Sequence, residues 1–189
     1  MGVSFNNIGE IYEIQGNYIK ALEYYSKSLE IKNEIGDKEG ISSTYSRIGL
    51  VYEKQGEYDK SMEYFEKALP MQVKEFGTEE HVDVAKTYAL MGWTCSKMSK
   101  YDLAMEYCMK SLKIRLKVLD EGHVDVGDSY NKIGVVYSDK AEYDKALEYY
   151  NKGLDIRINK LGKDHTDVAQ SYLGIANVYF EIFYRGFDP

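Results

Sequence analysis

Three histidines recur at an even spacing along the chain. His81, His123 and His165 are 42 residues apart, and imidazole is a common ligand of zinc. If the spacing reflects a repeated structural unit, equivalent atoms of neighbouring units lie about 8–10 Å apart, whereas zinc holds nitrogen ligands at about 2.1 Å. An aspartate follows each histidine by two residues, at Asp83, Asp125 and Asp167. We therefore expect no metal site. Each histidine should lie in a loop beside a helix start, where an aspartate in the first turn is favoured by the helix dipole.

The two cysteines are the other residues with reactive chemistry. Cys95 and Cys108 are too few for a disulfide framework and do not have the CxxC spacing of redox or zinc sites. Both occupy positions where equivalent phrases of the sequence carry an aromatic residue, which places them in the core. Because burial raises the pKa of a thiol and lowers its reactivity, we expect inert, reduced side chains.

Catalytic motifs are missing from the sequence. There is no nucleophile elbow, no glycine-rich phosphate loop and no HExxH. Carboxylates such as Glu13, Glu53 and Asp139 are numerous, but charges on a helix usually form a solvated face. The sequence predicts neither an enzyme nor a cofactor site.

Composition narrows the class of partner. The formal net charge is −7, and no run of five basic residues is present to neutralise successive phosphates. No stretch of about 18 apolar residues could span a bilayer. With 44% hydrophobic residues and only 2 prolines, the chain suits an ordered helical protein. We expect a cytoplasmic protein that binds protein rather than nucleic acid or membrane.

An internal repeat organises the chain and must position these residues. The phrases that begin Ile8-Gly9, Ile48-Gly49, Met91-Gly92, Ile133-Gly134 and Ile175-Ala176 are copies of one unit, and their small residues are 40, 43, 42 and 42 residues apart. A second phrase follows each of the first four, beginning at Tyr18, Tyr58, Tyr101 and Tyr143. Each unit therefore contains two segments.

The second segment has helical spacing. Tyr143, Ala146, Leu147, Tyr150 and Leu154 recur at three or four residues and share one face of a helix. Of the 19 tyrosines, 18 fall in five recurring columns, which favours core packing over a base-stacking surface.

Small residues and glycines mark where the helices approach one another and where they end. The small residues of the first helices, Gly9, Gly49, Gly92 and Gly134, are expected to face Ala21, Ser61, Ala104 and Ala146 on the second helices. Gly16 and Gly56 precede second helices, and Gly36, Gly77, Gly122 and Gly162 follow them, where chain reversal needs freedom in φ.

The pattern divides the chain into four repeats and a half repeat within one array. The expected bounds are 2–39, 40–81, 82–123 and 124–165, then a half repeat over 166–181 and an irregular tail over 182–189. A first helix is expected to begin directly after Met1. The half repeat lacks a second helix, and the tail carries Phe183 and Phe187. Such an uncapped end would bury itself against something, so we expect that the terminal repeats could form a homo-oligomer.

These residues resemble the tetratricopeptide repeat (TPR) family. The resemblance rests on an aromatic column at Phe5, Tyr45, Tyr88 and Tyr130, followed by Ile-Gly, then Tyr, then Gly-x-Tyr-x-x-Ala. The period of about 42, with segments such as Leu112-Lys113-Ile114-Arg115 to His123-Val124-Asp125-Val126, is similar to kinesin light chain repeats. The first junction, over residues 34–40, is more similar to the linkers of G-protein-modulator repeats. The resemblance implies an all-α, right-handed superhelical solenoid of antiparallel helix pairs, whose first helices line a concave groove.

The groove that the resemblance implies takes one face of each first helix. Its candidate peptide-binding residues are Asn6, Glu10, Glu13, Ser46, Leu50, Glu53, Lys86, Trp93, Lys97, Asn131, Val135 and Asp139. Trp93 is the only tryptophan, and it lies in a variable column. It either anchors a ligand, as tryptophan often does at binding hot spots, or packs between adjacent first helices.

The resemblance also suggests how a ligand would be held. In kinesin light chain-like repeats an asparagine contacts the peptide backbone, and Asn6 and Asn131 match its place, whereas Ser46, Ala89 and Leu173 do not. The basic cluster for tryptophan-acidic cargo and the clamp for a terminal carboxylate are absent. We expect a scaffold or adaptor that binds a peptide or helix with apolar anchors near Trp93, Leu50 and Val135, flanked by neutral or basic residues. The alternative is a self-associating structural spacer of a larger protein.

Overall fold

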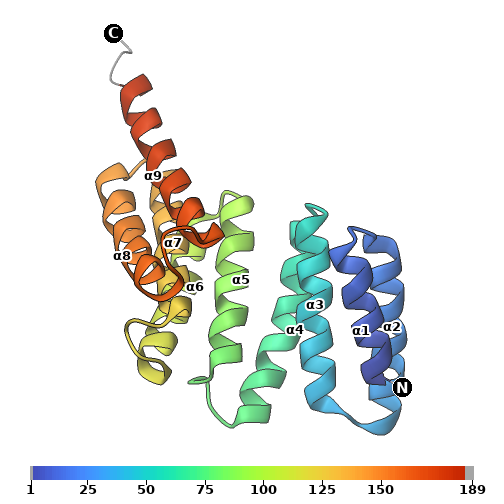
Figure 1. The fold of residues 1–189 in the computed structure, drawn as a ribbon. Coiled ribbons are helices and arrows are strands. Elements are labelled where there is room, and N and C mark those ends of the chain that lie inside the picture. Colours follow the sequence, from blue (N-terminus) through green and yellow to red (C-terminus); the bar gives the residue numbers. More distant parts are fainter. Residues whose placement is uncertain (1, 186–189) are drawn as a thin grey trace. The chain divides into compact units, whose positions relative to one another are not determined.

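The computed structural model describes residues 2–185, which form nine α-helices and no β-strand (Figure 1). The helices are α1 (Gly2–Ile14), α2 (Tyr18–Ile35), α3 (Lys38–Lys54), α4 (Tyr58–Phe76), α5 (Val82–Lys97), α6 (Tyr101–Val118), α7 (Val124–Asp139), α8 (Tyr143–Leu161) and α9 (Thr166–Arg185). The expected all-α fold is confirmed. None of the helices in this range is long and apolar enough to cross a membrane.

The helices group into two compact units. Unit 1, Met1–Glu79, contains α1 to α4, and unit 2, Glu80–Pro189, contains α5 to α9. Within them α1 packs on α2, α3 on α4, α5 on α6 and α7 on α8, and α9 packs on α8. Turns of three residues join the two helices of each pair, so the partners run antiparallel.

Helix bounds follow the expected repeats closely, with two differences. Helix α3 begins at Lys38, two residues before the expected start of the second repeat, because Asp37 caps it by accepting a hydrogen bond from Gly40 N at 2.9 Å. Helix α9 continues to Arg185, so residues 182–185 are helical where an irregular tail was expected. The rest of that tail, with Phe187, lies outside the described residues.

The turn inside each helix pair depends on one residue in the left-handed region. Gly16 and Gly56 have φ of 73° and 78°, and Ser99 and Ala141 take the equivalent places with φ of 58° and 60°. The following residue then donates its N–H back into the helix, as when Glu142 N binds Tyr137 O at 2.9 Å. A glycine is therefore replaced in two turns although the backbone conformation is kept.

Glycines after the second helices behave as expected in three of four cases. Gly36, Gly77 and Gly162 have positive φ. The expectation for Gly122 is wrong, because it is not among the residues with positive φ. Helix α6 ends at Val118, and the next residue, Leu119, is already extended with φ −125° and ψ 161°.

The small residues of the first helices permit close packing, but against other partners than expected. A Cβ placed on Gly9 would lie 2.7 Å from the ring of Tyr25, and one on Gly49 would lie 2.6 Å from the ring of Phe65. The equivalent contacts are Cys108 Sγ for Gly92 and the Tyr150 ring for Gly134. The nearest side chain thus comes four residues after the small residue of the second helix, one helical turn from the expected partner, although Ala104, the partner expected for Gly92, also lies close with its O at 3.1 Å.

Tyrosine columns form a repeated aromatic cluster on each helix pair. In the fourth repeat, Tyr130 and Tyr137 of α7 lie with ring centroids 6.0 and 5.4 Å from that of Tyr149 on α8. Lys152 Nζ lies 5.0 Å from the Tyr149 centroid and also pairs with Glu148. Equivalent rings surround Tyr24, Tyr64 and Tyr107. In the first four repeats the tyrosines of these clusters therefore pack between helices, as the columns predicted, whereas Tyr172 and Tyr179 of α9 are 51% and 59% exposed and depart from that prediction.

Candidate functional site

In unit 2 the candidate groove residues of α5 lie around the only tryptophan. Lys86, Trp93 and Lys97 share one face because they are spaced by seven and four residues. Trp93 is half-buried, and Lys97 Nζ lies 4.2 Å from the centre of its ring. Lys86 and Lys97 are exposed. This surface combines an aromatic side chain with two cations.

The candidate residues of α7 have different surroundings. Val135 is half-buried and packs on a core cluster that includes Val178 of α9. Asp139 is exposed and accepts a hydrogen bond from Ser96 of α5 at 2.5 Å. These contacts join the first helices side by side within unit 2. Val135 and Asp139 therefore make contacts that hold unit 2 together in addition to lying at its surface.

Asn131 does not present a free amide on this face. Only 7% of the residue is exposed, and its amide lies 2.7 Å from Ser171 Oγ of α9. With its oxygen turned toward Arg157, the amide also accepts from Nε and Nη2 at 3.2 Å. Its hydrogen-bonding groups are used inside unit 2, so we leave Asn131 out of the proposed ligand surface.

The candidate residues of unit 1 mostly connect α1 to α3. Asn6 accepts from Thr44 at 3.2 Å, and Glu10 pairs with Arg47 at 2.9 Å. Glu13 is only 8% exposed and pairs with Lys54 at 2.7 Å. The remaining three, Ser46, Leu50 and Glu53, are half-buried on α3.

Glu13 also has a partner on the second helix. The hydroxyl of Tyr25 donates to it at 2.8 Å. Burial and then the Glu13 carboxylate raise the pKa of Tyr25. The side chain of Glu13 therefore forms part of the interior of unit 1 rather than an open ligand contact.

The family model for the tetratricopeptide repeat matches the sequence in four overlapping stretches, residues 1–74, 41–117, 83–159 and 125–182. The chain belongs to the tetratricopeptide repeat family. The curated proteins include no sequence that matches it.

Solved TPR structures share the fold over nearly the whole chain. BtubC (BKLC) from P. vanneervenii is 25% identical with a TM-score of 0.81, over 93% of this chain and 70% of that one. A putative kinesin light chain with TPR-like repeats from Podosopora anserina is 17% identical with a TM-score of 0.76, over 97% and 87%. The apo form of RapI is 20% identical with a TM-score of 0.75, over 95% and 48%. The expected likeness to kinesin light chain repeats is confirmed.

Sequence reasoning missed a column of four buried polar residues, three of which connect a TPR repeat to the next one. Seven residues after the aromatic or cysteine that packs on the first-helix glycine, the chain carries Lys32, Gln72, Arg115 and Arg157. Each of the three cations is buried. A charge repeated seven residues after the aromatic column is the signal that could have revealed them, since that spacing returns to the same helix face.

The three cations bind the start of the next first helix in the same way. Arg157 Nη1 donates to Asp167 O at 2.8 Å and to Ser171 Oγ at 3.0 Å, both on α9. Arg115 does the same with Asp125 O and Ser129 Oγ of α7. In unit 1, Lys32 binds Gly40 O and Thr44 Oγ1 of α3, each at 2.8 Å. We call Lys32, Arg115 and Arg157 the junction cations.

One carboxylate balances the two junction arginines of unit 2. Asp128 Oδ2 lies 3.4 Å from Arg115 Nη1, and Asp128 Oδ1 lies 3.3 Å from Arg157 Nη2 and 2.9 Å from Lys132 Nζ. Burial would raise the pKa of Asp128, but Lys132 and the two arginines outweigh it and hold the pKa below its usual range. Asp128 is therefore a structural anion of the TPR array.

The histidines lie beside helix starts, as expected, and they also cap these helices, which was not predicted. Nδ1 of His81, His123 and His165 accepts from the backbone N–H two residues later at 3.2, 3.2 and 3.1 Å. In residues 2–185, no three His, Cys, Asp or Glu side chains are grouped to hold a metal ion. Both cysteines are buried, and burial raises the pKa of Cys108 to about 12.

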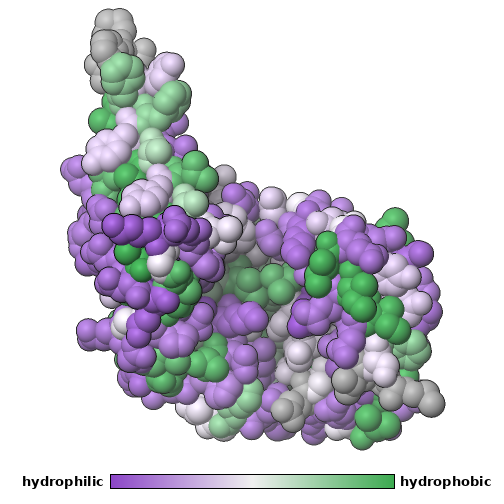
Figure 2. Space-filling view, in the orientation of Figure 1, coloured by the Kyte–Doolittle hydropathy of each residue, from purple (hydrophilic) through white to green (hydrophobic). Residues whose placement is uncertain are grey.

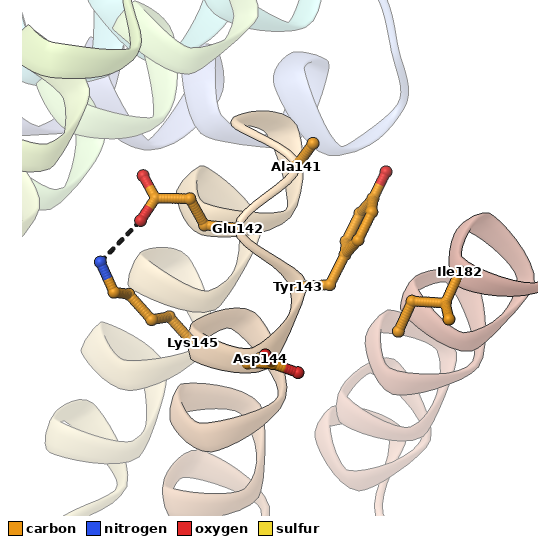
Figure 3. Close-up of a pocket in the computed structure, with 6 residues that line it drawn as sticks. All are labelled: Ala141, Glu142, Tyr143, Asp144, Lys145 and Ile182. Carbon is orange, nitrogen blue, oxygen red and sulfur yellow. Dashed lines mark hydrogen bonds and ion pairs between the residues drawn. The ribbon is translucent and has the colours of Figure 1, made fainter. Parts of the chain in front are cut away.

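Two open pockets occupy equivalent places in the repeats. One of about 380 Å³ lies between the start of α8, at residues 141–145, and Ile182 of α9. Figure 3 shows the Tyr143 ring between the α8 backbone and Ile182 of α9, with the paired Glu142 and Lys145 on the opposite side of the α8 backbone. The other lies between the start of α2 and Gln55, the residue that follows α3. Because the feature recurs where a turn meets the next first helix, it reflects repeat geometry rather than a specialised site.

Proposed function

We propose that this TPR chain is an interaction scaffold that holds a peptide or helical segment of a partner on the first-helix face of unit 2, against Trp93. Tetratricopeptide repeats are a protein-interaction fold. The observation that carries the proposal is the half-buried indole of Trp93 between the exposed cations Lys86 and Lys97. Tryptophan is enriched among residues that dominate binding energy.

Charge on this face supports a particular ligand chemistry. Among the carboxylates of α7, Asp128 is paired with two arginines, and Asp139 accepts a hydrogen bond from the neutral Ser96 hydroxyl. Lys86, by contrast, is exposed and takes part in no ion pair among residues 2–185. A ligand with an apolar anchor beside an acidic residue would meet Trp93 and the lysines together. We therefore propose that acidic residues flank the apolar anchor of the ligand. The overall charge of the face had instead suggested neutral or basic flanking residues.

The candidate residues of unit 1 stay a prediction. Its acidic side chains Glu10 and Glu13 are paired with Arg47 and Lys54, so they offer a ligand less free charge than the Trp93 surface does. Leu50, on α3, is the apolar residue of that face. A ligand contact at Leu50 would add to binding at the Trp93 surface, and binding at Trp93 does not require it.

Two matched peptide sets test the proposal. Each peptide carries one leucine or aromatic anchor, and the sets differ only in acidic or basic flanking residues. Labelled peptides are titrated with the protein while fluorescence anisotropy is followed, and Trp93 emission gives a second readout. We expect the acidic set to bind, and Trp93→Ala to weaken binding by about 30-fold, which corresponds to the loss of about 2 kcal/mol at a hot spot.

Charge variants separate the site from general attraction. Lys97→Gln should weaken binding, whereas Lys113→Gln, an exposed lysine on α6, should leave it unchanged. Circular dichroism checks that each variant keeps its helices. Equal affinity of folded Trp93→Ala and the unaltered protein would refute the proposal.

A further inference from the structure

Lys97 lies over the indole ring of Trp93 on the same helix. The two residues are four apart in the sequence, which places them one turn apart on one face of α5. Lys97 Nζ lies 4.2 Å from the centre of the ring, where the negative face of the indole attracts a cation. Trp93 is half-buried and Lys97 is exposed. One face of the ring that we propose as the ligand contact is therefore covered by a side chain of the protein itself.

Other lysines of the chain combine a ring with a carboxylate. Within residues 2–185, six of them lie over a tyrosine and also pair with a glutamate: Lys27, Lys60, Lys67, Lys110, Lys145 and Lys152. Lys152 Nζ, for example, lies 5.0 Å from the Tyr149 centroid and 2.6 Å from Glu148 Oε1. This pair contributes to the hydrophilic surface that Figure 2 shows over much of α8. These six ammonium groups are therefore each held by two partners.

Lys97 has the ring but not the carboxylate. In four of the six pairs the glutamate stands four residues before the lysine, whereas the residue four before Lys97 is Trp93 itself. Asp139, on the neighbouring first helix, accepts a hydrogen bond from Ser96 instead. No ion pair joins Lys97 to a carboxylate among residues 2–185. The ammonium of Lys97 is therefore a cation to which the described part of the chain supplies no counter-charge.

A ligand carboxylate can supply that counter-charge and thereby uncover the ring. A charge-assisted hydrogen bond between an ammonium and a carboxylate is stronger than an exposed cation–π contact, and the four-carbon stem of lysine lets the ammonium move. A ligand with a carboxylate near its apolar anchor therefore draws Lys97 away from the indole of Trp93. A ligand without a carboxylate must displace the ammonium from the ring and gains no ion pair in return.

We propose that Lys97 is a specificity-determining cover on Trp93, which makes access of an apolar anchor to the ring depend on an acidic residue of the same ligand. The inference rests on the proposed function and deepens it, because it fixes how the anchor and the acid are arranged. The two must lie one side-chain spacing apart, which is about 5–6 Å between residues i and i+4 of a helix and about 7 Å between residues i and i+2 of an extended peptide. Acidic residues farther along the ligand leave the cover in place.

Quenching of tryptophan fluorescence by acrylamide tests the cover without a ligand. Trp93 is the only tryptophan, and acrylamide is uncharged, so the quenching constant reports the exposure of this ring. Lys97→Ala should raise the constant, whereas Lys97→Arg should keep it near that of the unaltered protein, because a guanidinium also stacks on an aromatic face. Lys113→Ala, at an exposed position of α6, is the control. Equal quenching in Lys97→Ala and the unaltered protein overturns the cover.

Two pairs of synthetic peptides test the dependence on an acid. The peptides of a pair share a leucine anchor and differ only in carrying glutamate or glutamine, four residues after the anchor in a helical pair and two residues after it in an extended pair. In the pair that binds, Lys97→Ala should weaken binding of the glutamate peptide about three-fold and strengthen binding of the glutamine peptide about three-fold. Lys97→Arg should keep the preference of the unaltered protein for glutamate.

The opposite signs of the two changes distinguish a cover from an ordinary ligand contact. If Lys97→Ala weakens both peptides equally, or changes neither, the cover is overturned while the proposed function stands. If no peptide binds the unaltered protein, the proposed function fails, and the selection of ligands by Lys97 fails with it. Circular dichroism confirms that each variant stays helical.

Discussion

Arg157 of α8 and Asp128 of α7 are joined inside unit 2, with Nη2 3.3 Å from Oδ1, while the same guanidinium holds the start of α9. The arginine side chain is 5% exposed, and burial lowers the pKa of Arg157 against the opposing effect of Asp128. One charged group therefore connects three helices. Its removal leaves buried acceptors on both neighbours.

Replacing Arg157 should destabilise unit 2 more than replacing an exposed cation. Arg157→Met removes the guanidinium that donates to Asp167 O and Ser171 Oγ and pairs with Asp128, and we expect the free energy of unfolding to fall by about 3 kcal/mol. Arg157→Lys should lose less, because Lys32 makes the equivalent bonds in unit 1. Lys152→Met, whose pair with Glu148 is exposed, should cost under about 1 kcal/mol. Urea denaturation followed by circular dichroism measures all three. Similar losses for Met at 157 and at 152 would contradict the role of the junction cation.

Acid should weaken the fold through Asp128. Because the folded-state pKa lies below the usual value, the ionised carboxylate contributes stability that is complete above about pH 4 and is lost as pH falls through the lowered pKa. Asp128→Asn should be less stable at neutral pH but lose stability less steeply below about pH 4. Asp144→Asn, an exposed change on α8, controls for the loss of one negative charge. Urea midpoints measured against pH test this, and parallel profiles for Asp128→Asn and the unaltered chain would contradict it.

The turn before α8 should become more stable with glycine. Ala141 has a φ of 60°, a conformation that costs a residue with a Cβ about 1 kcal/mol or more. Ala141→Gly relieves this cost, partly offset by the entropy of glycine in the unfolded chain. We expect a higher melting temperature for Ala141→Gly. Ala169→Gly in the exposed interior of α9 should lower it, by about 1 kcal/mol of helix propensity. A decrease for both variants would show that the turn is not strained.

Replacing the buried Ser61 with alanine should stabilise the protein. Ser61 Oγ is buried and has no hydrogen-bond partner among residues 2–185, and the equivalent positions are Ala21, Ala104 and Ala146. Ser61→Ala removes the cost of burying an unsatisfied hydroxyl, so we expect stabilisation of about 1 kcal/mol. Ser26→Ala, exposed on α2, should change stability by under about 0.5 kcal/mol. Thermal unfolding distinguishes the two, and a loss for Ser61→Ala would reveal a partner for the hydroxyl.

Periodic features of the sequence predicted most of the fold. The Tyr columns and the Ile-Gly phrases define the helices and their pairing, because a repeated apolar spacing has only one helical face to occupy. The sequence placed the histidines beside helix starts, but it did not predict that their Nδ1 atoms accept from the backbone two residues later. The left-handed turns were harder to predict, because glycine is the only residue type that signals them. Ser99 and Ala141 carry no such signal, although their φ values match those of Gly16 and Gly56.

The candidate site was harder to read from sequence than the fold. Asn131 and Glu13 match exposed positions of the helical pattern, yet both bind groups within their own unit. Arg115 and Arg157 look like solvated charges in a sequence, but neighbouring helices bury them. Both outcomes depend on the distance between helices, and the spacing of residues along one helix carries no information on that distance. Trp93 stays the candidate anchor because no element of unit 2 encloses it fully.

The junction cations bear on how repeats can be duplicated or exchanged during evolution. Each one recognises a main-chain carbonyl and a hydroxyl four residues later, at Gly40 and Thr44, Asp125 and Ser129, or Asp167 and Ser171. A carbonyl is supplied by any amino acid. A gene segment that encodes one repeat could therefore be duplicated or exchanged, and the new neighbour would need only a serine or threonine in the right place to be joined.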